Sequence, residues 1–447
     1  MRIAMIGAGY VGLVSGTCMA SDGHHVTIVD VDPRKIARLN DGLMPVYEPG
    51  LDGLVSATVH SGHLHFTTEL ASAVAGADVV FIAVGTPSRR GDGHADLRYV
   101  EAAAEEIACA MQGYTVVVTK STVPVGTGHR LAELMARANP DAQFDVASNP
   151  EFLREGSALE DFRNPDRILI GSNSDQASAA LRQVYQSYVD RGIPLVETGI
   201  ETAELAKYAA NAFLATKITF INEMADLCER VGADVRDIAT VMGMDPRIGA
   251  SFLRPGPGYG GSCFPKDTTA LMRTAQEAGV PLRLVESTVM VNETRKGTMA
   301  GRIIRECGGS VRGRTIAVLG VSFKPDTDDM RDAPSLTIIP ALQDAGATIR
   351  AFDPAAMLDA SAQLPGVVWC GNPYETAHDA DAVVVLTEWS EFLTLDFTAL
   401  AATMRTPLLI DLRNAIGAER LERAEWRYRG IGRGEGSRPP LPRLTLL

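Results

Sequence analysis

The chain has 447 residues, of which 46% are hydrophobic and 22% are charged. This composition excludes a largely disordered chain, and the length indicates two or three domains. The net charge of −13 argues against general binding to nucleic acid or to anionic membranes, so an anionic ligand must be held by local basic groups. No apolar run approaches the length of a membrane span.

The N-terminus and the cysteines predict a cytoplasmic protein. The sequence Met-Arg-Ile-Ala-Met-Ile-Gly becomes glycine-rich before the core of a signal peptide could form. The six cysteines show neither paired nor metal-like spacing, so we expect reduced thiols and no metal site.

The first part of the chain alternates between apolar strands and helix-like stretches. A strand over residues 2–6 runs into Gly-Ala-Gly-Tyr-Val-Gly at 7–12, and a helix-like stretch follows. Continuous apolar strands that alternate with helices indicate a parallel sheet covered on both faces. Further strands are expected at 25–30, 78–84, 114–119, 144–147 and 167–170.

The middle of the chain reads as helical, with one loop. Residues 201–230 contain no turn signal and are rich in Ala, Leu, Glu and Lys, which predicts one long helix. Residues 245–267 hold many Gly and Pro residues and are expected to form a loop. Helical periodicity returns over 268–307.

A second strand pattern follows, at 315–319, 347–353, 382–386 and 407–411. Its first turn, Gly320-Val-Ser-Phe-Lys-Pro325, lacks the glycine spacing of the first turn, so we expect it to bind something other than a dinucleotide. The whole chain is therefore expected to be an α/β protein, with two Rossmann-like, doubly wound parallel-sheet domains joined by a long central helix and helical region. The expected boundaries are 1–200, 201–307 and 308–433, with a flexible tail over 434–447.

The glycines at 7, 9 and 12 fit the dinucleotide fingerprint G-x-G-x-x-G between a strand and a helix. The first permits a tight turn, the second lets a pyrophosphate approach the backbone, and the third lets the helix pack on the strand. Asp30 ends the next strand at the expected distance and could accept hydrogen bonds from a ribose. Because its charge repels a 2′-phosphate, NAD is expected rather than NADP. An alternative is an ordinary surface Asp at a strand end.

Two further loops follow strands of the same predicted sheet. Thr86 and Thr122 lie in them and are candidate contacts to a cofactor or a water. Polar residues that begin a helix are the alternative, because Thr often has that role.

Charged side chains in the middle of the chain allow two interpretations each. Glu151 and Glu155 are four residues apart, which suits either a reactive pair or a solvated helix face. Lys207 and Asn211 share this spacing in an unusually apolar part of the long helix. A lysine there either extends to water or is buried beside an anion or a developing oxyanion.

Cys263 lies in the glycine-rich run Gly258-Tyr-Gly-Gly-Ser-Cys-Phe-Pro-Lys-Asp267. An accessible thiolate is a nucleophile, and the neighbouring Lys266 would favour it. The other five cysteines lie in helix-like or strand-like stretches and are interpreted as small hydrophobic residues.

Taken together, these motifs resemble the UDP-glucose/GDP-mannose dehydrogenase family, from Met1 to about Arg433. The resemblance rests on the runs already described and on Ser-Thr-Val-Pro, Asn-Pro-Glu-Phe-Leu-Arg-Glu-Gly, Glu-Leu-Ala-Lys-Tyr-Ala-Ala-Asn and Phe-Lys-Pro-Asp-Thr-Asp-Asp-Met-Arg, which begin at residues 121, 149, 204 and 323. It implies a four-electron oxidation of a sugar-nucleotide primary alcohol to a carboxylate, with two NAD. The substrate is then UDP-glucose, and the helical region carries the catalytic cysteine and a dimer contact.

The resemblance also assigns roles to residues. Asp267 takes the hydroxyl proton through a water, Lys207 and Asn211 stabilise the oxyanion, and Cys263 forms the thiohemiacetal and thioester. Glu151 activates the hydrolytic water, with Thr122 as a helper. The implied cofactor contacts are Gly7, Gly9, Tyr10, Val11, Gly12, Asp30, Lys35, Thr86, Thr122, Glu155, Lys266 and Arg331. The implied substrate contacts are Phe152, Leu153, Arg154, Lys207, Asn211, Arg247, Phe252, Leu253, Arg254, Gly260, Phe264, Phe323, Lys324 and Arg413, of which Arg247 reaches a neighbouring subunit's substrate.

Several alternatives remain open. GDP-mannose 6-dehydrogenases and UDP-N-acetyl-hexosamine 6-dehydrogenases share the catalytic set and differ in base and sugar contacts. A two-electron hydroxyacid dehydrogenase would have the first domain and the long helix but no use for Cys263 or a second sheet. A non-catalytic dinucleotide sensor would be expected to have lost the catalytic residues. The downstream use of the sugar acid, such as polysaccharide biosynthesis, is not encoded in these motifs.

Overall fold

The computed structural model describes residues 1–89, 93–417, 420–421 and 425–433. The tail expected over 434–447 lies outside the described residues. The chain divides into two compact units, Met1–Ala210 with Thr269–Pro281 and Asn211–Thr268 with Leu282–Leu447. The long helix α10 (Ile200–Val231) begins in the first unit and continues into the second.

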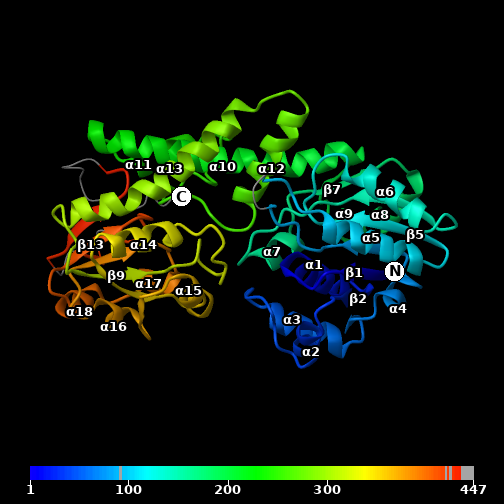
Figure 1. Ribbon diagram of the computed structural model, residues 1–447, viewed down its shortest axis with the longest axis horizontal. Helices are drawn as coiled ribbons and strands as arrows, with labels where there is room; N and C mark the ends of the chain where they lie inside the picture. The colour runs from blue at the N-terminus through cyan, green and yellow to red at the C-terminus, as the bar shows by residue number, and fades with distance from the viewer. Residues whose placement is uncertain (90–92, 418–419, 422–424, 434–447) are drawn as a thin grey trace. The chain divides into compact units, whose positions relative to one another are not determined.

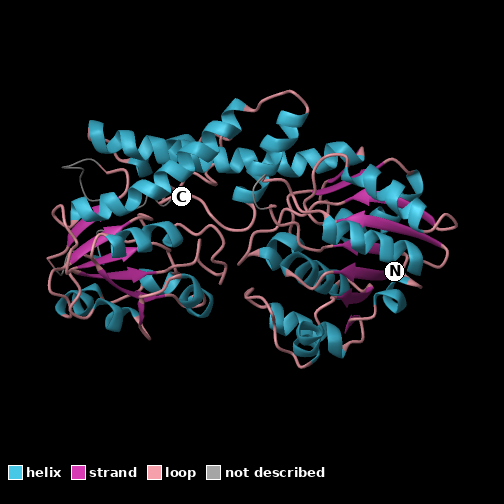
Figure 2. Cartoon of the chain, in the orientation of Figure 1, coloured by secondary structure: helices cyan, strands magenta, loops and turns pink. Residues whose placement is uncertain are grey.

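The first unit is built on an eight-stranded sheet in the order β3-β2-β1-β4-β5-β6-β7-β8 (Figures 1 and 2). Its first six strands have the Rossmann order. The pairing of β7 with β6 is antiparallel, so the sheet is mixed at this one junction. The strands are β1 (Arg2–Ile6), β2 (His25–Val29), β3 (Leu64–Thr67), β4 (Val79–Ile82), β5 (Tyr114–Thr119), β6 (Gln143–Ser148), β7 (Ile168–Ser172) and β8 (Leu195–Thr198).

Both faces of this sheet are buried. Ile3 and Met5 of β1 join one hydrophobic cluster, and Ala4 and Ile6 join the other. Alternate side chains of a strand point to opposite faces, which explains the continuous apolar run. The helices of this unit are α1 (Tyr10–Ser21), α2 (Pro33–Asn40), α3 (Leu51–His60), α4 (Leu70–Val74), α5 (Arg98–Ala110), α6 (Thr127–Ala138), α7 (Ala158–Arg163), α8 (Asp175–Val184) and α9 (Gln186–Asp190), with the start of α10.

The second unit has a six-stranded parallel sheet in the order β11-β10-β9-β12-β13-β14, which is again the Rossmann order. Its strands are β9 (Thr315–Leu319), β10 (Thr348–Phe352), β11 (Val368–Trp369), β12 (Ala382–Val385), β13 (Leu408–Asp411) and β14 (Arg427–Gly430). Its shorter helices are α14 (Ser335–Asp344), α15 (Met357–Gln363), α16 (Pro373–Ala377), α17 (Ser390–Leu393) and α18 (Phe397–Ala402).

The helical region consists of α10, α11 (Val235–Gly243), α12 (Phe264–Glu277) and α13 (Arg283–Glu306). The prediction of a loop through residue 267 is wrong at its end, because α12 begins at Phe264. Pro265 falls in the first turn of this helix, where its missing amide hydrogen costs nothing. No helix among the described residues is long and apolar enough to cross a membrane.

Candidate active site

The glycine-rich turn of the first unit has the geometry that a dinucleotide requires. Gly7 has a φ of +111°, and a Cβ on Gly12 would lie 1.9 Å from the Gly7 carbonyl oxygen. A Cβ on Gly9 would meet nothing within 4 Å. Gly9 is also the N-cap of α1, whose first turn has no acidic residue and no side-chain cap. The turn therefore leaves open space at a helix N-terminus, which suits a pyrophosphate.

Asp30 lies at the end of β2, beside this turn. Its carboxylate accepts hydrogen bonds from the amides of Ala8 at 2.9 Å and Asp32 at 3.0 Å, and from Lys35 Nζ at 2.8 Å. Burial opposes ionisation, but these bonds outweigh it and hold the pKa of Asp30 below its usual range. Asp30 is thus an ionised acceptor, and Lys35 lies directly on it.

Glu48, which was not predicted from the sequence, connects the glycine-rich turn to the loop after β6. Its buried carboxylate accepts hydrogen bonds from the Tyr10 hydroxyl and from the amides of Gly156 and Ala158, both at 2.7 Å. Burial and the hydrogen bond to Glu48 raise the pKa of Tyr10, with a smaller contribution from Glu155. The sequence feature that could have identified Glu48 is the run Tyr-Glu-Pro-Gly at 47–50.

The loops after β4 and β5 meet through their threonines. The Thr86 hydroxyl donates a hydrogen bond of 2.9 Å to the Thr122 carbonyl oxygen. Thr86 therefore has a structural partner in this unit, while Thr122 presents a half-buried side chain.

Glu151 and Lys207 form a buried ion pair, with 3.3 Å between Oε1 and Nζ. Lys207 is 2% exposed, so it does not extend to water. Residues 149–156 are not helical, so the spacing of Glu151 and Glu155 does not place them on one helix face. A solvated helix face is thereby excluded for Glu151. Glu151 also accepts the Leu153 amide at 2.6 Å, and Lys207 lies 5.3 Å from the centre of the Phe152 ring.

A second buried lysine, Lys120, adjoins this pair. Its Nζ donates to the Asn149 side-chain oxygen at 2.9 Å and to the Asn149 carbonyl oxygen at 3.3 Å. Burial lowers the pKa of Lys120 to about 8, while Glu151 acts to raise it and Lys207 to lower it. The sequence feature that marks Lys120 is its position directly after an apolar strand, but Thr122 was the residue predicted from that motif.

In the second unit, Asn211 and Asp267 lie together. Asn211 Nδ2 donates to Asp267 Oδ2 at 2.6 Å, and Lys266 Nζ lies 2.5 Å from Asp267 Oδ1. Asp267 is 1% exposed. Lys266 therefore pairs with Asp267, whereas its place in the sequence predicted that it would favour the Cys263 thiolate. Because Lys207 and Asn211 are four apart on α10, both buried polar pairs are attached to one turn of this helix.

Cys263 is half-buried at the start of α12, with its sulfur 3.5 Å from the Ser262 hydroxyl. The six cysteines all lie in the described part of the chain, and none of them forms a disulfide there. Cys18, Cys228, Cys307 and Cys370 are buried, as expected for small hydrophobic residues, but Cys109 is exposed and departs from that interpretation.

The loop that leads to Cys263 is fixed from two sides within the second unit. Asn292 of α13 accepts the Tyr259 amide at 2.8 Å and donates to the Tyr259 carbonyl oxygen at 3.1 Å. A Cβ on Gly260 would lie 2.3 Å from the Asp332 carbonyl oxygen, and one on Gly261 would lie 2.7 Å from the Phe323 ring. Side chains other than glycine are therefore excluded here, and the loop approaches the turn after β9 closely.

Basic and aromatic residues predicted to bind substrate gather at this turn. Arg413 donates to the carbonyl oxygens of Leu386 at 2.7 Å and Phe323 at 2.9 Å, and a Cβ on Gly256 would lie 3.0 Å from its guanidinium. Lys324 Nζ lies 5.5 Å from the centre of the Phe323 ring. Phe252 has a φ of +65° and packs on Phe264, with 6.0 Å between ring centroids. Leu253 of the same loop is buried.

The other arginines that were predicted to bind cofactor or substrate are near the surface. Arg254 is exposed, and Arg154, Arg247 and Arg331 pair with Asp161, Asp245 and Asp329. These ion pairs raise the pKa of Arg154 and Arg247.

In the second sheet, the residue equivalent to Asp30 is turned inward. Asp353, at the end of β10, has no exposed surface. It accepts hydrogen bonds from the amides of Val321, Ser322, Ala355 and Ala356 and lies 3.3 Å from the Trp389 indole nitrogen. A ribose therefore has no access to this carboxylate, as expected from the altered turn.

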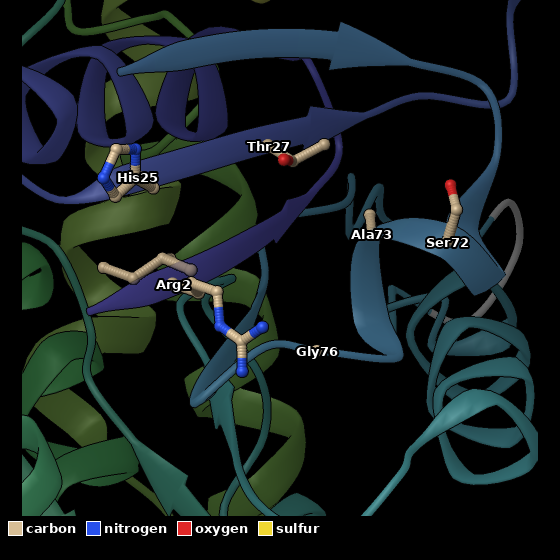
Figure 3. Close-up of a pocket in the computed structure, with 7 residues that line it drawn as sticks. Arg2, His25, Thr27, Ser72, Ala73 and Gly76 are labelled. Carbon is tan, nitrogen blue, oxygen red and sulfur yellow. The ribbon is translucent and has the colours of Figure 1, made fainter. Parts of the chain in front are cut away.

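A separate hollow lies at the other end of the first sheet, where β1 and β2 begin. Figure 3 shows the Arg2 guanidinium near Gly76, with His25 and Thr27 on the neighbouring strand. It contains none of the predicted site residues. Among the described residues, no group of three His, Cys, Asp or Glu side chains could hold a metal ion.

Comparison with known proteins gives consistent results along the chain. Three models of the UDP-glucose/GDP-mannose dehydrogenase family match it: the NAD binding domain over residues 1–189, the central domain over 201–294 and the UDP binding domain over 317–418.

Dehydrogenases that act on UDP-sugars, by their names, are similar to this chain over nearly its whole length. The UDP-glucose 6-dehydrogenase of Rhizobium meliloti is 57% identical over 97% of this chain and 100% of its own, and TuaD of Bacillus subtilis is 47% identical over 97% and 93%. Among solved structures, a UDP-glucose dehydrogenase from Pyrobaculum islandicum has a TM-score of 0.88 at 39% identity, covering 96% of this chain and 97% of that one. The UDP-D-ManNAc dehydrogenase of Pyrococcus horikoshii has a TM-score of 0.83 at 28% identity, covering 97% and 99%.

Proposed function

Because the chain belongs to the UDP-glucose/GDP-mannose dehydrogenase family, we propose that it oxidises UDP-glucose to UDP-glucuronate with NAD as oxidant. The observation that carries the proposal is the pair of buried polar contacts on one turn of α10, Lys207 with Glu151 and Asn211 with Asp267. An alcohol oxidation requires acid and base groups and hydrogen-bond donors for an oxyanion, in surroundings shielded from water.

The residues of the first unit fit NAD. Gly9 offers the open space for the pyrophosphate, and Asp30 with Lys35 offers an acceptor and a donor for the adenosine ribose. When bound, NAD accepts the hydride that leaves C6 of the sugar in each of the two oxidations. Tyr10, Val11, Thr86 and Glu155 of the first unit belong to the same proposed set, and Lys266 and Arg331 of the second unit are further proposed cofactor contacts.

The first oxidation removes a proton from the C6 hydroxyl. Asp267 takes this proton through a water, since its carboxylate is buried and held by Asn211. Lys207 and Asn211 stabilise the negative charge that develops on the oxygen.

The second oxidation occurs while the substrate is attached covalently to Cys263. Cys263 adds to the aldehyde to form a thiohemiacetal, and loss of a hydride and a proton gives a thioester. Water then adds to the thioester carbon, the carbon–sulfur bond breaks, and the water's proton passes to Glu151, with Thr122 as a helper. A covalent adduct retains the aldehyde while the reduced cofactor is exchanged.

Most of the proposed substrate contacts lie in loops of the second unit, and three lie in the first. Phe323, Lys324 and Arg413 with the Phe252–Gly256 loop hold the uridine diphosphate, since local positive charge is needed on an acidic chain. Phe152, Leu153 and Arg154 line the sugar and phosphates, and Gly260 and Phe264 complete the set.

A homodimer is part of this proposal. Phe213, Phe220 and Leu227 lie seven residues apart on α10, and each exposes more than two-fifths of its surface. Heptad spacing of exposed apolar residues is typical of a helix that packs against another helix. Arg247 then reaches the neighbouring subunit's substrate. Light scattering on the wild type and on Phe220→Asp checks this, and a monomeric wild type would refute it.

The activity is tested by the NADH yield per substrate consumed, with UDP-glucose and GDP-mannose side by side. Two NADH per UDP-glucose, with turnover lost in Cys263→Ser, are expected. One NADH per substrate would refute the thioester route. A preference for GDP-mannose or for a UDP-N-acetyl-hexosamine would keep the mechanism and change the substrate.

A further inference from the structure

We propose that Lys120 is a positioning residue for the hydrolysis of the thioester: it fixes the Asn149–Glu151 segment so that Glu151 stays oriented beside Lys207. This inference rests on the proposed function of Glu151 and adds a residue to which that function assigns no role.

The geometry shows how Lys120 fixes the segment. Its ammonium contacts both oxygens of Asn149, two residues before Glu151, and lies within 3.5 Å of the Tyr185 hydroxyl. Tyr185 in turn donates to the Asn149 side-chain oxygen at 2.5 Å. Asn149 Nδ2 donates to the Leu169 carbonyl oxygen at 2.8 Å, and its amide donates to the Thr119 carbonyl oxygen at 2.9 Å. These hydrogen bonds therefore fix the position of Asn149, at the N-terminal end of the Glu151 segment.

The charge balance explains why a lysine matters here. Lys120, Lys207 and Glu151 are all at least nine-tenths buried, so two cations share one carboxylate. Apart from Glu151 and Lys207, the groups around the ammonium are neutral: Asn149, Tyr185 and the Phe81 ring, whose centre is 5.9 Å away. Burying an ammonium on neutral oxygens is costly, and a neutral donor would hold Asn149 at a lower cost.

The positive charge of Lys120 acts on the step that needs a base. Two buried ammonium groups, those of Lys120 and Lys207, adjoin Glu151, which takes the proton of the attacking water in the proposed mechanism. Because burial lowers the pKa of Lys120 to about 8, the ammonium form dominates at neutral pH and is lost above that value.

The test compares the wild type with Lys120→Met, Glu151→Gln and Tyr185→Phe. Met has the length of Lys without its charge, and Tyr185→Phe removes one neutral partner of Asn149 but leaves Lys120 in place. In Lys120→Met we expect kcat to fall on the order of 10²-fold, the lower end of what a general base contributes, with the KM values for UDP-glucose and NAD within about twofold. We also expect the acyl adduct on Cys263 to accumulate during turnover, as in Glu151→Gln, which intact-protein mass spectrometry detects. Tyr185→Phe should show neither effect.

A merely structural role would lower kcat without an adduct, or raise both KM values, and either result overturns the inference. If Lys120→Met is insoluble, Lys120→Gln provides the same comparison with a polar side chain. The rate advantage of the wild type over the variant should also shrink as pH rises through about 8. Failure of the proposed function is distinguishable, because then the wild type itself would not give two NADH per UDP-glucose.

Discussion

The glycines of the dinucleotide fingerprint are under different constraints, some from packing and some from cofactor binding. Substitutions can distinguish these two kinds of constraint. In Gly12→Ala the new Cβ would lie 1.9 Å from the Gly7 carbonyl oxygen, so the helix must move off the strand. We expect a loss of about 3 kcal/mol or more in the free energy of unfolding. Gly9→Ala meets no atom within 4 Å, so its stability should change by less than about 1 kcal/mol, while NAD affinity falls at least about tenfold because the methyl group occupies the pyrophosphate space.

Urea unfolding and calorimetric titration with NAD measure the two effects. Gly23→Ala, in a turn of the same unit with open space but a φ of +93°, controls for backbone strain alone. Normal NAD affinity in a folded Gly9→Ala protein would contradict the assigned role of this turn.

At the scale of single residues, the sequence predicted what local context fixes. The glycines and Asp30 follow from the strand–turn–helix pattern, because each is needed where the chain itself turns. Lys207 could not be decided between exposed and buried, since burial depends on Glu151, 56 residues away in sequence. Lys120 and Glu48 were missed for the same reason: their partners come from other loops.

At the scale of helices, α10 holds α6 through a buried acid. Glu204 accepts hydrogen bonds from the amides of Gly126 at 2.7 Å and Gly128 at 2.8 Å, where α6 begins. Burial raises the pKa of Glu204 from 4.5 to about 7, although these amides act to lower it. The folded state therefore binds a proton that the unfolded state releases between these values, and stability falls as pH rises from 4.5 to about 7.

We expect this acid to contribute about 2–3 kcal/mol to that fall. Glu204→Gln should flatten the pH dependence of unfolding in urea between pH 5 and 7. Glu201→Gln, on the same helix but exposed and paired with His129, should leave the curve parallel to the wild type. A Glu204→Gln curve that runs parallel to the wild type would contradict the prediction.

The elements that the sequence did not predict share a physical property. The edge strand β11 has two residues, and β3, β8 and β14 each mix apolar with polar or charged residues, so none shows a continuous apolar run. The early start of α12 was missed because the glycines before it extended the loop signal to Asp267. Long elements such as α10 were found because 32 residues without a turn signal leave one interpretation.

At the scale of the whole molecule, the two sheets share a strand order but not a ligand. In the first unit the acid at the end of β2 faces the turn and pairs with Lys35, whereas in the second the acid at the end of β10 is fully buried. The altered turn at Gly320 predicted this difference in ligand, and the hydrogen bonds of Asp353 explain it. One chain should therefore bind one dinucleotide.

Calorimetric titration with NAD should give one equivalent per chain, and a separate titration with UDP should also give one. Asp30→Ala should lower NAD affinity by at least about tenfold through loss of the ribose contacts, and should leave UDP affinity unchanged because the second sheet carries that site. Arg413→Ala is the matched variant and should have the reverse effect. Two NAD equivalents per chain, or normal NAD binding after Asp30→Ala, would mean that the second sheet has kept a dinucleotide site despite its buried acid.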